Sequence, residues 1–243
     1  VPSGKVMRAL IGDQRYLVAE TYVVRVLFYF GTLFEVNRER LVVRPEYFNM
    51  YRTLENSVLL DPYNMDAYYF SQAAFTWELK RFREVNGMLK YGMKYRTWDY
   101  QLPFFIGFNS AYFLKDYHTA ADYMKQAAEL SGNSLFTTLA SRYFYEAGKT
   151  DFGILFLESM AKGTRDQKLK NVYLLRIRAL RAVQELNDAL STFQTEQGKM
   201  PTDLNELVES GIVPRIPDDP YGGKFYLDRD GKIRTTSKFA MKY

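Results

Sequence analysis

The sequence of 243 residues contains no cysteine and only one histidine, His118. The absence of cysteine excludes disulfide bonds, thiol catalysis and cysteine-ligated metals. A single histidine cannot form a histidine metal cluster or a proton relay with a second histidine. Because His118 falls between two expected helices, we predict that it is an exposed turn residue.

Sequence motifs of common enzyme classes are also absent. The chain has no phosphate-binding loop, no dinucleotide-binding glycine loop and no nucleophile elbow. Its Asp and Glu pairs fall where exposed helix faces are expected, which disfavours acid–base catalysis by two carboxylates. We therefore predict that the protein is not an enzyme and carries no cofactor.

The charge is balanced, with no block of one sign. The 33 Lys and Arg residues are interleaved with 28 Asp and Glu residues, and the net charge is +5. No RNA-recognition or helix-turn-helix signature is present, so we expect no nucleic-acid partner. A mildly basic surface slightly favours acidic partners or an anionic membrane face.

Long hydrophobic runs are missing as well. The longest apolar stretch, Tyr22 to Phe34, is shorter than a membrane span and contains Arg25. We therefore expect no segment to cross a membrane. The first residue is Val1, not Met, and we expect that a signal, a membrane anchor or cloning residues preceded it.

Aromatic residues, by contrast, are abundant. The chain has 20 Tyr and 18 Phe. Stacked helices use such side chains at their contacts, so packing in a core is the favoured interpretation. An aromatic groove for a ligand is the alternative.

Four helix hairpins recur in register along the first two thirds of the chain. Ser57, Gly92, Ala127 and Met160 occupy equivalent positions, at spacings of 35, 35 and 33 residues. A period near 34 with small residues at fixed offsets is typical of tetratricopeptide repeats. Such repeats build a curved binding surface.

Helical periodicity predicts the elements of these hairpins. Expected helices cover residues 17–35, 45–60, two within 64–95, 102–112, one that starts at 116, and two within 134–163. Pro45 is expected to open the second of these helices. An insertion from Val36 to Arg44 precedes it.

A different pattern begins near Lys168. Asn171 to Glu196 predicts one long helix with an apolar stripe, ended by Gly198 and Pro201. A short helix with a capping-box pattern at Thr202 and a proline-rich loop follow. Residues 224–228 and 232–236 predict a β-hairpin.

Together these patterns predict a mainly α fold. Residues 5–165 are expected to form an α-solenoid of about four tetratricopeptide-like hairpins. Residues 168–243 are expected to form the long helix and a small α+β tail that ends in the hairpin.

The repeat half resembles bacterial tetratricopeptide proteins of the cell envelope. The residues that carry this resemblance are Leu10-Ile11-Gly12, Leu17-Val18-Ala19-Glu20, Tyr29-Phe30-Gly31, Leu102-Pro103-Phe104 and Gly107-Phe108-Asn109. The resemblance implies a protein-binding groove lined by the first helix of each hairpin.

The tail resembles the C-terminal half of type II secretion major pseudopilins. The resemblance is carried by Gly198 to Val208, with its Pro-x-x-Leu-x-x-Leu-Val pattern, and by Ile216 to Tyr226, with Asp-Pro-x-Gly. The chain departs from that family because the tail follows repeats and no prepilin peptidase site is visible. The resemblance therefore implies a reused structural module rather than a polymerising pilin.

The repeat family implies a set of groove positions. They are Phe70, Ala74, Trp77 and Glu78 in the second repeat, Phe105, Asn109 and Tyr112 in the third, and Thr138, Arg142, Tyr145 and Glu146 in the fourth. The amide of Asn109 would pair with a peptide backbone, and Arg142 would bind a carboxylate. The alternative is that the tail or the long helix of the protein fills this groove.

The pseudopilin resemblance also implies a calcium loop. Asp218, Asp219, Asp228 and Asp230 are the candidate oxygen ligands. Loop capping and turn formation by these aspartates is the favoured alternative, so we predict no metal site.

These resemblances imply a non-enzymatic scaffold or adaptor that binds a protein or peptide. The expected location is the periplasmic side of a bacterial cell envelope, in an assembly of the type IV pilus or type II secretion kind. A cytoplasmic location is the alternative. The rival function is a structural subunit whose pilin-like tail makes the assembly contacts.

Overall fold

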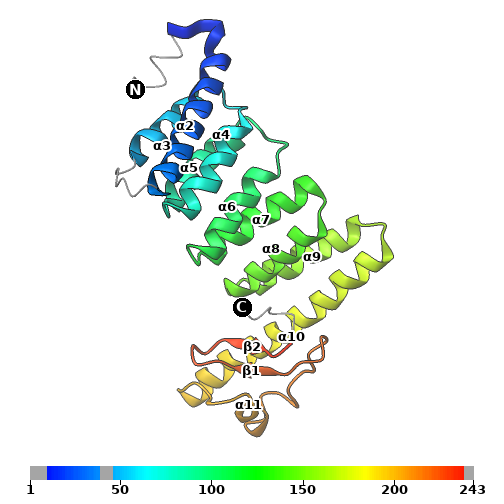
Figure 1. Cartoon of the computed structure of the whole chain (residues 1–243). Helices are drawn as coiled ribbons and strands as arrows, with labels where there is room; N and C mark the ends of the chain where they lie inside the picture. Colours follow the sequence, from blue (N-terminus) through cyan, green and yellow to red (C-terminus); the bar gives the residue numbers. More distant parts are fainter. Residues whose placement is uncertain (1–9, 39–45, 238–243) are drawn as a thin grey trace. The chain divides into compact units, whose positions relative to one another are not determined.

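The computed structural model describes residues 10–38 and 46–237 and is mainly helical, as predicted (Figure 1). The elements are η1 (Gly12–Gln14), α2 (Arg15–Arg38), α3 (Tyr47–Leu60), α4 (Met65–Phe70), the π-helical η2 (Ser71–Phe75), α5 (Phe82–Met93), α6 (Gln101–Tyr112), α7 (Tyr117–Ser131), α8 (Ser134–Glu146), α9 (Thr150–Gly163), α10 (Gln167–Gln197), α11 (Asn205–Glu209), β1 (Phe225–Leu227) and β2 (Ile233–Thr235). Pro45 and most of the predicted insertion lie outside the described residues.

The chain divides into two compact units. Unit 1 comprises residues 1–115 and 129–131, and unit 2 comprises 116–128 and 132–243. This boundary falls inside the predicted repeat region, not near Lys168. The reason is that α10 packs along α9, so the long helix and the last hairpin share one core.

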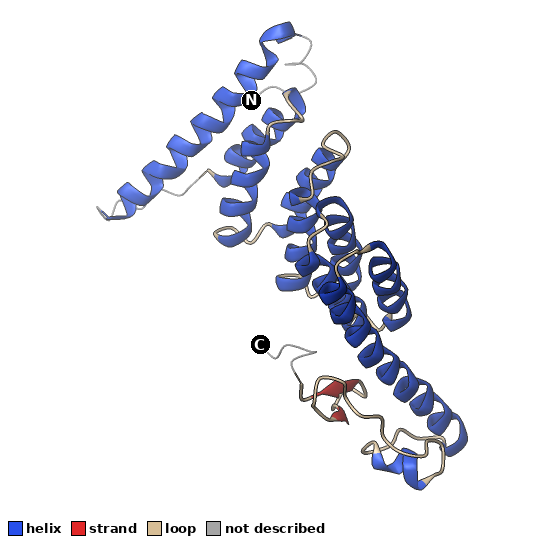
Figure 2. Ribbon diagram, turned by 90° about the vertical axis from the view of Figure 1, so that its right-hand side faces the viewer, coloured by secondary structure: helices blue, strands red, loops and turns tan. Residues whose placement is uncertain are grey.

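The first hairpin of unit 1 is formed by α2 and α3. Ala19, Tyr22 and Leu60 are buried together at this contact. The hydroxyl of Ser57 donates a hydrogen bond of 2.8 Å to the backbone carbonyl of Ala19. Figure 2 shows α2 along one edge of unit 1, with α3 beside it.

The apolar stretch considered in predicting that no segment spans a membrane was too short. Gly12–Leu33 is helical, and by length and composition it is apolar enough to cross a bilayer. The sequence argument began the apolar stretch at Tyr22, whereas the helix begins earlier and carries apolar side chains on two faces. In this structure one of those faces packs on α3.

The second hairpin depends on a close approach at Gly92. Tyr68 is completely buried, and its hydroxyl donates a hydrogen bond of 3.0 Å to the carbonyl of Pro62. A Cβ atom at Gly92 would lie 2.6 Å from Cζ of this ring. The α4–α5 contact therefore requires glycine at the predicted repeat anchor.

The turn between the two helices of a hairpin repeats a backbone conformation. Lys80, Lys115 and Gly148 all have left-handed φ angles, of 54°, 54° and 71°. They lie 35 and 33 residues apart, which is the same spacing as the anchors predicted from sequence. Three turns therefore share one left-handed backbone conformation at spacings of 35 and 33 residues.

Unit 2 is organised around α10. The side chain of Asp166 caps its start by accepting from the backbone amides of Lys168 and Leu169, and Gly198 ends it with a left-handed φ of 67°. The first part of the helix packs on α9, and the second part packs on α11 and the hairpin. The residues buried along its second part include Leu186 and Phe193. The predicted apolar stripe is thus the core-facing side of the helix.

The tail folds as the sequence predicts at the level of its elements. Strands β1 and β2 are antiparallel, with Phe225 opposite Thr235. The short helix α11 follows Thr202, whose backbone amide donates a hydrogen bond of 2.9 Å to Glu206. The hairpin and the short helix are therefore confirmed. The N-cap of α11 is Leu204, not the predicted Thr202, and it makes no side-chain capping bond.

The contact at Gly92 predicts the effect of a single methyl group. Gly92→Ala would force Tyr68 or α5 to move and should destabilise the protein by about 1–3 kcal/mol. Gly87→Ala, in the same helix with open space around it, should stabilise by up to about 1 kcal/mol. Urea unfolding of both variants checks this pair. Equal stabilities would show that the α4–α5 contact tolerates a Cβ.

Candidate functional site

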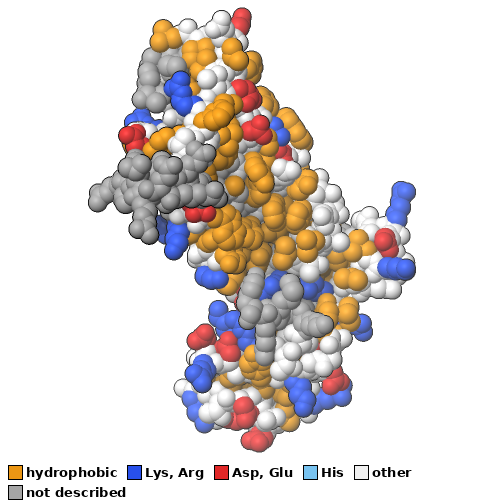
Figure 3. Space-filling view, in the orientation of Figure 1, with side chains coloured by type: hydrophobic (Ala, Val, Ile, Leu, Met, Phe, Trp, Pro, Cys, Tyr) orange, Lys and Arg blue, Asp and Glu red, His pale blue; other side chains and the backbone are white. Residues whose placement is uncertain are grey.

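Aromatic side chains line a pocket of about 220 Å³ in unit 1. The pocket lies between the segment formed by α4 and η2 and the neighbouring helix α6. Its lining residues are Tyr69, Gln72, Ala73, Trp77, Phe104, Phe105 and Phe108. Figure 3 shows that hydrophobic side chains are abundant on the visible face of unit 1.

Trp77 is the centre of a cluster of rings. Its ring centroid lies 5.0 Å from that of Phe113, 5.7 Å from Tyr112 and 6.2 Å from Phe108. Phe113 in turn stacks on Phe82 at 4.3 Å, which holds the cluster against α5. Trp77 nevertheless remains 51% exposed. The cluster therefore presents a rigid aromatic surface to solvent.

A buried amide network lies beneath this surface. Gln72 and Asn109 exchange two hydrogen bonds of 2.8 Å, and Asn109 donates a third, also of 2.8 Å, to Asn86. All three side chains are buried. The network links η2, α5 and α6, and it places Gln72 at the wall of the pocket.

The π-helical turn η2 sets which side chains reach the pocket. A π-helical turn holds more residues than an α-helical turn, so the side chains that follow it are rotated about the helix axis. Gln72 and Ala73 lie within η2 and line the pocket, while Ala74 is buried on the other side. Insertions of this kind are frequent at functional sites.

The structure brings some of the predicted groove residues together and separates others. Trp77 and Phe105 line the pocket, and Tyr112 contacts Trp77 beside it. Glu78 is exposed next to Trp77. Phe70 packs edge-on against Phe30 of α2 at 5.5 Å and is not part of the pocket lining.

Asn109 differs most clearly from its predicted role. Its side chain is completely buried, and its amide oxygen and nitrogen are engaged by Gln72 and Asn86. It therefore does not present an open amide to a peptide. The physical reason is its place on the buried stripe of α6, with Leu102 and Ile106, one helical step away from the open face.

Five residues of the pocket lining were not among the predicted groove positions, namely Tyr69, Gln72, Ala73, Phe104 and Phe108. In α6 the signal was present, because Phe104, Phe105, Phe108 and Tyr112 recur at intervals of three and four residues. In the α4–η2 segment no sequence signal marks the π-helical turn.

The predicted groove positions of the fourth repeat lie in unit 2, and the tail contacts two of them, Tyr145 and Glu146. Tyr145 is 7% exposed, and its hydroxyl donates a hydrogen bond to the carbonyl of Ile233 in β2. Arg142 is buried, and Thr138 is half-buried. At Tyr145 and Glu146 of α8, the alternative prediction applies, in which the protein's own tail fills the groove.

Arg234 of β2 joins the tail to α8. It forms an ion pair of 2.7 Å with Glu146 and another of 3.0 Å with Asp228. Burial lowers the pKa of the Arg234 guanidinium, but the hydrogen bonds that it donates to these carboxylates raise it more, so that the pKa lies above its ordinary value. The guanidinium therefore stays charged, and it links the hairpin turn to the last residue of α8.

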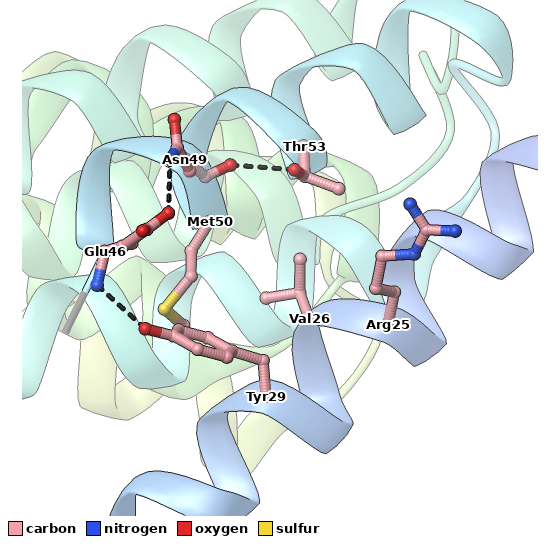
Figure 4. Close-up of a pocket in the computed structure, with 7 residues that line it drawn as sticks. All are labelled: Arg25, Val26, Tyr29, Glu46, Asn49, Met50 and Thr53. Carbon is pink, nitrogen blue, oxygen red and sulfur yellow. Dashed lines mark hydrogen bonds between the residues drawn. The ribbon is translucent and has the colours of Figure 1, made fainter. Parts of the chain in front are cut away.

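A second pocket, of about 180 Å³, lies between α2 and α3 (Figure 4). The Tyr29 hydroxyl accepts a hydrogen bond of 3.0 Å from the backbone amide of Glu46, whose carboxylate accepts from Asn49. Val26, Met50, Thr53 and Arg25 complete the lining. The polar groups near Glu46 are thus satisfied by one another, which leaves a mainly apolar hollow.

The candidate calcium ligands act as turn-forming groups. Asp219 accepts from the backbone amide of Tyr221 at 2.8 Å and from the hydroxyl of Thr235. Asp228 accepts from the amides of Asp230 and Lys232, each at 2.9 Å. Asp218 is exposed, as is Asp230. Among residues 10–38 and 46–237, no three His, Cys, Asp or Glu side chains converge in a way that could hold a metal.

Neither pocket contains a pairing suited to covalent or acid–base catalysis. The aromatic pocket carries one amide, and the second pocket carries one carboxylate that is already hydrogen-bonded. His118 lies in α7 of unit 2, exposed and 3.2 Å from Asp122. The arrangement of the aromatic pocket favours binding of an apolar or aromatic group.

A scan against models of protein families and a search of curated proteins found no match for this sequence. The assignment of the candidate site therefore rests on the geometry of the aromatic pocket.

The buried amide network predicts that Asn109 is a stability residue. Asn109→Ala would remove three buried hydrogen bonds from the side chains of Gln72 and Asn86 and should cost about 2 kcal/mol or more of unfolding free energy. Asn187→Ala, at an exposed helical position, should leave stability nearly unchanged. Urea unfolding measures both. Unchanged stability of the Asn109 variant would contradict the network.

The environment of Tyr145 predicts that this residue makes a pH-dependent contribution to the unfolding free energy. Burial, opposed by Arg234, raises the pKa of its hydroxyl to about 12. Its ordinary value is about 10, so its contribution is complete below pH 10 and is lost as the pH rises through about 12.

Tyr145→Phe should cost about 1 kcal/mol at neutral pH. The stability gap to the native chain should then narrow between pH 10 and pH 12, which unfolding curves at several alkaline pH values would test. Tyr51 and Tyr68 also have raised pKa values, but they are present in both proteins and cancel in the difference. A constant gap would show that Tyr145 does not titrate in this window.

Proposed function

We propose that this protein is a non-enzymatic scaffold that binds an extended peptide segment of a partner protein on the aromatic surface of unit 1. The observation that carries the proposal is the pocket beside Trp77, because it combines an exposed tryptophan with a preformed apolar hollow. Tryptophan and tyrosine are the side chains most often found at the energetic centre of protein interfaces.

The composition of the pocket favours a peptide with a bulky apolar side chain. Its volume of about 220 Å³ suits one such side chain, and the wall amide of Gln72 adds one polar contact. The ring of Tyr112 lies under the ammonium group of Lys115 at 5.6 Å, and Glu78 is exposed nearby. An apolar centre with a charged rim is the usual arrangement of a protein interface.

The binding surface proposed here is smaller than a groove running through all repeats. The fourth hairpin is occupied by the tail through Tyr145 and Arg234. A partner segment would therefore contact the second and third hairpins, where the aromatic side chains remain open. This limits the proposed peptide to a short stretch.

We further propose an α-solenoid of tetratricopeptide type that serves as an adaptor in a bacterial envelope assembly, of the pilus or type II secretion kind. The support for this step is the sequence resemblance and the repeated left-handed turn at Lys80, Lys115 and Gly148. The rival role, a structural subunit that assembles through its tail, has weaker support. The tail uses Tyr145, Arg234 and Glu146 for contacts within unit 2.

Trp77 is the residue that tests the binding proposal. Random peptides displayed on phage would be selected on the immobilised native chain and then titrated in solution. Trp77→Ala should weaken the enriched peptides by roughly thirtyfold or more, since loss of an interface tryptophan commonly costs about 2 kcal/mol. The readout is the dissociation constant for each variant.

Trp98→Ala is the matched control. Trp98 of unit 1 is 60% exposed, against 51% for Trp77, but it stacks on Tyr63, away from the pocket lining. Its loss should leave peptide affinity unchanged. Failure to enrich any peptide, or equal binding to the Trp77 variant, would refute the proposed site.

A further inference from the structure

Helix α2 has a second apolar face that no described residue covers. Ala19, Val23 and Val26 are buried on one side of the helix. The opposite side exposes Leu17 at 68%, Val24 at 46% and Phe28 at 74%. Their spacings of seven and four residues put these three large side chains near one line along the helix. Helix α2 itself lies along one edge of unit 1 (Figure 2).

The exposed line has the spacing of a coiled-coil seam. Leu17, Val24 and Gly31 are seven residues apart, and Thr21 and Phe28 lie between them. Alternate steps of four and three residues are those of the a and d positions of a heptad. The seam covers two heptads. Leu10 is not included, because the turn at Gly12, with φ of 55°, precedes the regular helix.

The charges beside this seam complement one another across a parallel pair of helices. With Thr21 and Phe28 at a positions, Glu20 occupies a g position and Arg25 the next e position. In a parallel coiled coil a g residue contacts the e residue that follows five positions later on the partner helix. Glu20 of one helix therefore meets Arg25 of the other.

Both charged side chains are free to make this contact. Glu20 and Arg25 are exposed, and neither has a hydrogen bond or an ion pair with another described residue. Figure 4 shows the Arg25 guanidinium without a bonded neighbour among the residues drawn. A two-fold axis would form the pair twice, once on each side of the seam.

We propose that α2 is a homodimerisation helix that pairs in parallel with α2 of a second copy of this chain. Leu17, Val24 and Phe28 fill the seam, and two Glu20–Arg25 pairs fix direction and register. With two heptads buried, the dimer is a weak one.

A lipid surface fits this face less well than a second copy does. Helices that lie on anionic membranes carry Lys and Arg along both borders of the apolar face, whereas here Glu20 borders one side and Arg25 the other. A membrane-spanning position would also separate α2 from α3 and break the Ser57–Ala19 hydrogen bond. The two signs of charge are explained by self-pairing.

Charge reversal tests the proposal through sedimentation equilibrium of the whole chain over a wide range of concentration. Glu20→Arg and Arg25→Glu should each place like charges together and weaken self-association by roughly tenfold or more. The double variant exchanges the two signs and should restore the native dissociation constant. Glu185→Arg, at an exposed position of α10, changes the net charge equally and should have no effect.

Other outcomes would overturn the proposal. A chain that stays monomeric at every concentration has no such dimer, and a dimer that is unaffected by both single changes uses another surface. Loss without recovery in the double variant would refute the parallel register. Flotation with phosphatidylcholine–phosphatidylglycerol vesicles supplies the lipid test. Vesicle binding by a monomeric chain would assign the face to a membrane, and circular dichroism verifies that each variant is folded.

Discussion

The arrangement of unit 1 depends on the satisfaction of three buried amides. Gln72, Asn86 and Asn109 come from η2, α5 and α6, and each would carry a large desolvation cost if its partners moved away. Their mutual hydrogen bonds therefore fix the distance and rotation of three helical segments. The aromatic side chains of Trp77 and its neighbours are attached to these same segments, so the amide network also fixes the positions of the exposed rings.

Unit 2 depends on the burial of the apolar side of α9, the second helix of its hairpin. Here α10 lies along α9, and the second part of α10 packs on the β-hairpin. Arg234 of this hairpin forms an ion pair with Glu146 of α8. The tail is therefore built into the core of the last hairpin, which explains why the contact boundary does not fall where the composition changes.

The positions of most helices and strands could be predicted from the sequence. Which side chains on a helix face solvent and which are buried was harder to predict. Periodicity and turn residues placed the helices, the anchor at Gly92 and the position of the β-hairpin, because these follow from apolar spacing and from steric limits. They misplaced Asn109, since a polar residue on a helix looks the same whether it bonds to a ligand or to buried neighbours. They also missed Gln72, because the π-helical turn rotates the face without changing composition. The covering of Tyr145 depends on Ile233, 88 residues further along the chain, and no local pattern encodes it.

That long separation also orders the events of folding. The helices of a hairpin contact residues close by in sequence, and such local contacts form rapidly. The bond from Tyr145 to Ile233 and the ion pair from Glu146 to Arg234 each close a loop of 88 residues. During synthesis α8 is therefore complete well before the strand that covers it exists. For that interval its inner side chains are open to solvent, and the chain presents to chaperones a surface that the finished protein hides.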